Sequence, residues 1–125
     1  MWQQLQRIGQ RAIWSWDGFV HVYRTEGSLS QWLVANAVFG VLAFALPLTG
    51  GERAVVLMGG VFVLAMECMN TAVERVVDDI STETRVLARQ AKDTASAAVA
   101  LSGIGVGVAW AVILWNVWGR SGQFS

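Results

Sequence analysis

Long apolar runs without charge alternate with short polar stretches along the chain. The clearest run covers residues 95–118, and an earlier one covers residues 29–48. A third covers residues 54–77, although it carries Glu67 and Glu74. A helix needs about 20 apolar residues to cross a bilayer core of about 30 Å, so each run is long enough to span a membrane. The pattern therefore predicts three transmembrane helices.

The two connections between these spans differ in their predicted length. Pro47 ends the first span because proline cannot continue a helix, and the following Thr49-Gly50-Gly51 predicts a tight turn. The second boundary is a longer polar stretch, residues 78–94, which is predicted as a loop.

Residues 2–25 show apolar side chains at helical spacing instead of in one run. The apolar positions are Trp2, Leu5, Ile8, Ala12, Trp16, Phe19 and Tyr23. This spacing predicts an amphipathic helix that lies in the membrane interface. The predicted fold is an all-α membrane protein, in which a surface helix and three spans form one domain over residues 1–125.

Composition and charge narrow the possible functions. The chain is 54% hydrophobic, has nine basic and nine acidic residues, and carries no net charge. Nucleic-acid binding needs a basic face, so it is not expected. A single cysteine excludes an intramolecular disulfide and a thiolate metal cluster.

The basic residues gather at one side of the predicted spans. Those in the N-terminal segment and around the long loop are Arg7, Arg11, Arg24, Arg75, Arg85, Arg89 and Lys92. The opposite side holds Arg53 and Arg120. Because cytoplasmic loops are enriched in lysine and arginine, the N-terminus is predicted in the cytoplasm and the C-terminus outside.

Four polar residues share one face of the second predicted span. On an ideal helix, Glu67, Asn70, Glu74 and Asp78 fall within an arc of about 80°. Ionisable residues within a span are functional candidates by default. A partly desolvated carboxylate can serve as a general base, and carboxylates nearer water, together with Glu26, can hold Mg²⁺. The alternative is a structural hydrogen bond between helices, with Glu67 protonated.

Lys92 and Asp93 stand just before the third predicted span, where a helix is expected to begin. The free N–H groups of a helix start, together with a lysine, form a site for anions. Asp93 has a second interpretation as the N-cap of that helix. A lysine near carboxylates suits phosphate and metal binding, and phosphoryl transfer depends mainly on positioning and charge neutralisation. The chain lacks the Gly-x-x-x-x-Gly-Lys-Ser/Thr motif of a P-loop.

These segments resemble the prokaryotic integral membrane diacylglycerol kinase family. The resemblance is carried by Glu-Cys-Met-Asn-Thr-Ala-Val-Glu-Arg-Val-Val-Asp at 67–78, Ala-Lys-Asp at 91–93 and Ser-Ala-Ala-Val at 96–99. It implies a homotrimer of three-span subunits in the bacterial cytoplasmic membrane, with sites shared between neighbours. It also implies that ATP and Mg²⁺ are used to phosphorylate the hydroxyl of diacylglycerol, which gives phosphatidic acid.

The resemblance further implies roles for particular residues. Glu67 would be the catalytic base, with Asn70 beside it. The metal ligands would be Glu26 and Glu74. The nucleotide-binding residues would be Arg7, Glu26, Glu74, Glu83, Lys92 and Asp93. The residues that contact the lipid substrate would be Glu67, Ser96 and Trp110.

Several positions depart from the best-known members of that family. Trp14 replaces a tyrosine near the adenine, and charged residues are replaced by Ser30, Trp32, Val86 and Gln90. These departures leave the adenine contacts and the lipid preference open, since some relatives phosphorylate undecaprenol.

A different class of function is a small membrane transport protein that uses the carboxylates as a cation relay. The first and third spans carry no charge, which argues against a relay across the whole bilayer.

Overall fold

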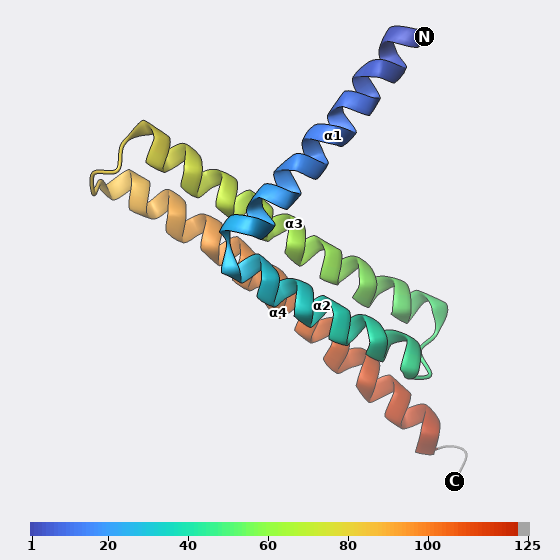
Figure 1. Cartoon of the computed structure of the whole chain (residues 1–125). Coiled ribbons are helices and arrows are strands. Elements are labelled where there is room, and N and C mark those ends of the chain that lie inside the picture. Colours follow the sequence, from blue (N-terminus) through green and yellow to red (C-terminus); the bar gives the residue numbers. More distant parts are fainter. Residues whose placement is uncertain (123–125) are drawn as a thin grey trace.

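A computed structural model describes residues 1–122 as four helices (Figure 1). The helices are α1 (Trp2–Thr25), α2 (Gly27–Ala45), α3 (Gly50–Ile80) and α4 (Val86–Gly122). The described residues contain no strand. The helices α2, α3 and α4 are each long and apolar enough to cross a membrane. The prediction of an all-α protein with a surface helix and three spans is therefore confirmed; residues 123–125 of the predicted domain lie outside the described range.

The central helix of the bundle is α3, which packs against both α2 and α4. Figure 1 shows α1 projecting away from this bundle and meeting it only near the junction with α2. Val22 is the buried residue of α1. The apolar residues near the start of α1 stay exposed, including Trp2, Leu5 and Ile8, as the predicted interfacial helix requires.

The junction between α2 and α3 differs from the prediction. Helix α2 ends at Ala45, and Leu46 is extended with φ −87° and ψ 150°. The residue before a proline avoids the helical conformation, so the helix stops ahead of Pro47 and the predicted span 29–48 is three residues too long at this end.

The predicted turn at Thr49-Gly50-Gly51 is wrong, because the two glycines already belong to α3. Thr49 is the N-cap of this helix, and its Oγ1 accepts a hydrogen bond from the Glu52 N–H at 3.2 Å. The Glu52 carboxylate accepts in turn from the Thr49 N–H at 2.8 Å. This capping box satisfies two free N–H groups and extends the helix to the loop. Arg120, near the end of α4, pairs with the same carboxylate at 2.8 Å.

The loop between α3 and α4 is much shorter than predicted, since it covers only residues 81–85. Arg85 Nη2 donates to the Val77 carbonyl at 3.3 Å and to the Ser81 carbonyl at 3.2 Å, which satisfies free carbonyls at the end of α3. Lys92 and Asp93 consequently lie in the second turn of α4. The predictions that they flank a helix start, and that Asp93 is its N-cap, are wrong.

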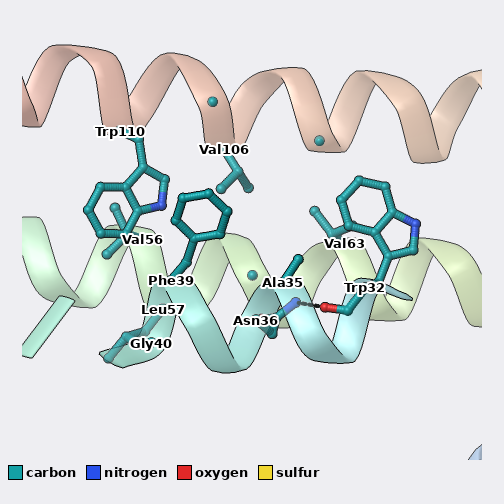
Figure 2. Close-up of a pocket in the computed structure, with 13 residues that line it drawn as sticks. Trp32, Ala35, Asn36, Phe39, Gly40, Val56, Leu57, Val63, Val106 and Trp110 are labelled. Atoms are coloured by element: carbon teal, nitrogen blue, oxygen red, sulfur yellow. Dashed lines mark hydrogen bonds between the residues drawn. The ribbon is translucent and has the colours of Figure 1, made fainter. Parts of the chain in front are cut away.

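An apolar cavity of about 210 Å³ lies between α2, α3 and α4 (Figure 2). Trp32 and Trp110 line its opposite ends, and Phe39 packs against Trp110 with ring centroids 5.5 Å apart. Asn36 lies over Gly60, where a Cβ would overlap the Asn36 Oδ1 atom. The close packing of α2 on α3 therefore requires a glycine at this position.

Candidate active site

Glu67 is a buried carboxylate in the middle of α3, with 5% of its surface exposed. Its Oε1 accepts a hydrogen bond from the Ser28 hydroxyl, which comes from the first turn of α2. Burying a carboxylate is costly unless it is hydrogen-bonded. The Ser28 hydroxyl therefore accounts for part of the tolerance of Glu67 at the interface between α2 and α3.

The four residues of the predicted polar stripe become more exposed towards the C-terminal end of α3. The continuous helix from Gly50 to Ile80 keeps the four residues on one face. Glu67 is buried, Asn70 and Glu74 are half-buried, and Asp78 is exposed. The stripe thus leads from an enclosed carboxylate to an open, charged end beside the loop.

Asn70 and Glu74 are paired along the stripe. Asn70 Nδ2 donates to Glu74 Oε1 at 3.3 Å, whereas Asn70 Oδ1 is buried and has no hydrogen-bond partner among residues 1–122. The amide also lines a groove between α3 and α4 that includes Met66 and Ala95. The amide oxygen of Asn70 is therefore a buried polar atom next to the Glu74 carboxylate.

Glu26 sits at the junction between α1 and α2, in extended backbone with φ −118° and ψ 112°. Its carboxylate lies 3.6 Å from Arg75 Nη2, and the same atom of Arg75 donates to Thr25 Oγ1 at 2.6 Å. Since Arg75 follows Glu74 directly, these contacts bring Glu26 and the start of α2 to the level of Glu74 on α3.

The donors around Glu26 and Glu74 suit a hard cation. Within residues 1–122, no group of three or more histidine, cysteine or acidic side chains could hold a metal. Mg²⁺ is commonly bound through one or two carboxylates together with water and the phosphates of a substrate. The side chains of Glu26, Glu74 and Asn70 carry oxygens of the kind that such a site uses.

Lys92 lies at the mouth of the site. Its Nζ is 2.6 Å from Asp78 Oδ1, and both side chains are partly exposed. Lys92, Glu83 and Asp93 all line one cleft of about 330 Å³ between the end of α3, the loop and the start of α4. The cleft gathers three of the predicted nucleotide residues, whose roles stay predictions.

The remaining predicted residues, Arg7, Ser96 and Trp110, lie on α1 and α4, outside the cleft that contains Lys92. Arg7 is exposed on α1, nineteen residues before Glu26, which is about 28 Å along a helix. Ser96 is exposed on α4, and Trp110 is buried fourteen residues further, about 21 Å along the same helix. Trp110 lines the apolar cavity of Figure 2.

Sequence reasoning missed three contacts that shape the site. Ser28 bonds the buried carboxylate, Arg75 pairs with Glu26, and Asp78 pairs with Lys92. The one signal for Ser28 was a polar residue at the start of an apolar span, two positions after Glu26. Helical periodicity relates residues on one helix and gives no information about contacts between helices.

The amino-acid sequence of this chain is similar to those of known proteins. The chain matches the family described as prokaryotic diacylglycerol kinase over residues 13–114. It is 36% identical to a diacylglycerol kinase of Pseudomonas aeruginosa over 110 residues, covering 88% of this chain and 89% of that protein. It is 33% identical to the diacylglycerol kinase of Escherichia coli strain K12 over 113 residues, covering 90% and 93%. The family match includes all of α2 and α3, α4 as far as residue 114, and α1 from residue 13 onward.

Proposed function

The chain belongs to the prokaryotic diacylglycerol kinase family and acts as a diacylglycerol kinase of the bacterial inner membrane; on this premise we propose how its residues carry the reaction. ATP donates its γ-phosphoryl group to the free hydroxyl of diacylglycerol, which yields phosphatidic acid and ADP. The observation that carries the assignment of residues is the buried carboxylate of Glu67, set in an apolar helix below a cleft that contains Lys92.

Glu67 is the general base in this proposal. Its carboxylate takes the proton of the lipid hydroxyl while the hydroxyl oxygen attacks the γ-phosphorus, and the bond to the β-phosphate oxygen breaks. Eleven residues separate Glu67 from the exposed Asp78, about 16 Å along the helix. That depth suits a hydroxyl at the glycerol of a lipid, which enters sideways from the inner leaflet.

Lys92 and the carboxylates serve the nucleotide. The Lys92 ammonium binds the phosphates in the cytoplasmic cleft, and Glu83 and Asp93 line the same cleft. Glu26 and Glu74 would hold Mg²⁺ together with the nucleotide, and Asn70 would supply a further oxygen. When bound, the cation neutralises charge on the phosphates. The protein supplies positioning and charge, which is most of what phosphoryl transfer requires.

We propose a homotrimer with shared sites, in which each subunit is a single membrane domain of residues 1–125. Arg7 is exposed on α1, about 28 Å along the helix from Glu26, so it would reach a site more easily in a neighbour. Trp110 is buried in the bundle of its own subunit, and its contact with the lipid stays a prediction. Ser96 is exposed and can face lipid from the same or an adjacent copy. The clustering of basic residues puts the N-terminus and the 81–85 loop in the cytoplasm, and the C-terminus outside.

The test offers diacylglycerol and undecaprenol separately, in mixed micelles with radiolabelled ATP and Mg²⁺, to the purified protein. We expect labelled phosphatidic acid at a rate well above any labelled undecaprenyl phosphate. A preference for undecaprenol would overturn the substrate assignment while keeping the family. Transfer to neither lipid would overturn the proposed reaction.

A further inference from the structure

We propose that Ser28 is a positioning residue for Glu67, fixing the plane of its carboxylate so that the second oxygen faces the lipid hydroxyl. This inference rests on the proposed role of Glu67 as the base. Ser28 Oγ donates to Glu67 Oε1 across 39 residues of sequence. Within the described residues it is the side chain that hydrogen-bonds this carboxylate.

A glutamate carboxylate needs a hydrogen-bond partner of this kind if its orientation towards a substrate is to be fixed. The terminal torsion of its side chain is broad, so packing of the aliphatic part alone does not define the carboxylate plane. A serine hydroxyl has one proton to donate and therefore holds one carboxylate oxygen. The other oxygen keeps its capacity to accept the proton of the substrate hydroxyl.

The position of Ser28 connects the base to the proposed metal ligand. Ser28 stands two residues after Glu26, whose carboxylate contacts Arg75 on α3. The start of α2 is thus joined to α3 at two points, one at the carboxylate of Glu67 and one beside Glu74. A shift of α2 along α3 would move both together, so Ser28 couples the orientation of the base to the location of Glu26.

The first experiment compares Ser28→Ala with Ser30→Ala, purified in the same mixed micelles. Ser30 lies in the first turns of the same helix, and its side chain makes no hydrogen bond within residues 1–122. We expect Ser28→Ala to lower kcat about 10-fold because a misoriented base loses near-attack geometry. The KM for ATP should stay within twofold, and Ser30→Ala should match the wild type. A normal kcat for Ser28→Ala, or an equal loss in both variants, would overturn the proposal.

Two further variants separate orientation from packing. Ser28→Thr keeps the hydroxyl and should recover most of the kcat that alanine loses; a threonine variant as slow as the alanine variant would contradict the proposal. In a Glu67→Gln background, Ser28→Ala should cause less than a twofold further change, because the base is already absent. A persistent 10-fold loss there would assign Ser28 a different role.

These results also separate failure of this inference from failure of the proposed reaction. If Glu67→Gln is nearly inactive and Ser28→Ala is normal, only the role of Ser28 is refuted. If Glu67→Gln turns over normally, the proposed base is wrong and the inference about Ser28 falls with it.

Discussion

A methyl group added at Gly60 should destabilise the bundle measurably. An ideal Cβ there would overlap Asn36 Oδ1 and lie 3.2 Å from Asn36 Cγ. Overpacking of this kind costs about 1–3 kcal/mol. Asn36 cannot turn away freely, because its Nδ2 donates to the Trp32 carbonyl at 3.0 Å, a bond that contributes about 1 kcal/mol.

The higher helix propensity of alanine partly opposes this loss of stability. Alanine is about 1 kcal/mol more favourable than glycine inside a helix, which offsets the loss of the Asn36 hydrogen bond. We therefore expect Gly60→Ala to lower the free energy of unfolding by about 1–3 kcal/mol. The measurement is equilibrium unfolding in mixed micelles with increasing SDS, followed by tryptophan fluorescence.

Gly105 on α4 provides the matched control, since a Cβ there would meet nothing within 4 Å. Gly105→Ala should be neutral or slightly stabilising. Adding Asn36→Ala to Gly60→Ala removes the atoms that clash, so the double variant should regain much of the lost stability. Equal stability of Gly60→Ala and Gly105→Ala would refute the packing argument.

Two further predictions concern the nucleotide and the metal. Lys92→Met should raise the KM for ATP at least about 10-fold, because a charge-assisted contact to phosphate is lost; Arg89→Met, which removes the same charge from the same cleft, should change it much less. If ATP titrations give the same rise in KM for both variants, the effect comes from the overall charge of the cleft and not from a contact between Lys92 and phosphate. Glu74→Gln should raise the Mg²⁺ concentration for half-maximal rate about 10-fold, because a hard-cation ligand is lost. The exposed Asp79→Asn serves as its control, and a Mg²⁺ titration that shifts equally in both variants would contradict the ligand role.

The helices were largely predictable, because they follow from local patterns. The long apolar runs predicted the three spans, and the spacing of Glu67, Asn70 and Glu74 put these residues on one face of α3. The hairpin between α3 and α4 was misjudged because five of the nine residues 86–94 are polar or charged. Leu87, Ala88 and Lys92 are nonetheless good helix formers, so the polar segment extends α4 towards the loop.

The partners within the site were not predictable from the sequence. Ser28 and Glu67 lie 39 residues apart and meet only because α2 packs against α3. The contact between Arg75 and Glu26 depends in the same way on where the chain turns between α1 and α2. Local patterns define which face of a helix is polar, whereas tertiary packing decides which helix that face meets.

The most direct test of the account is the turnover of purified Glu67→Gln with diacylglycerol, ATP and Mg²⁺. Glutamine keeps the shape of the side chain and can still accept a hydrogen bond from Ser28, so assembly in detergent should match the wild type. We predict that the turnover rate falls about 100-fold or more, because the base is lost. A variant that assembles normally and keeps near-normal turnover would contradict the central claim that this buried carboxylate activates the lipid hydroxyl.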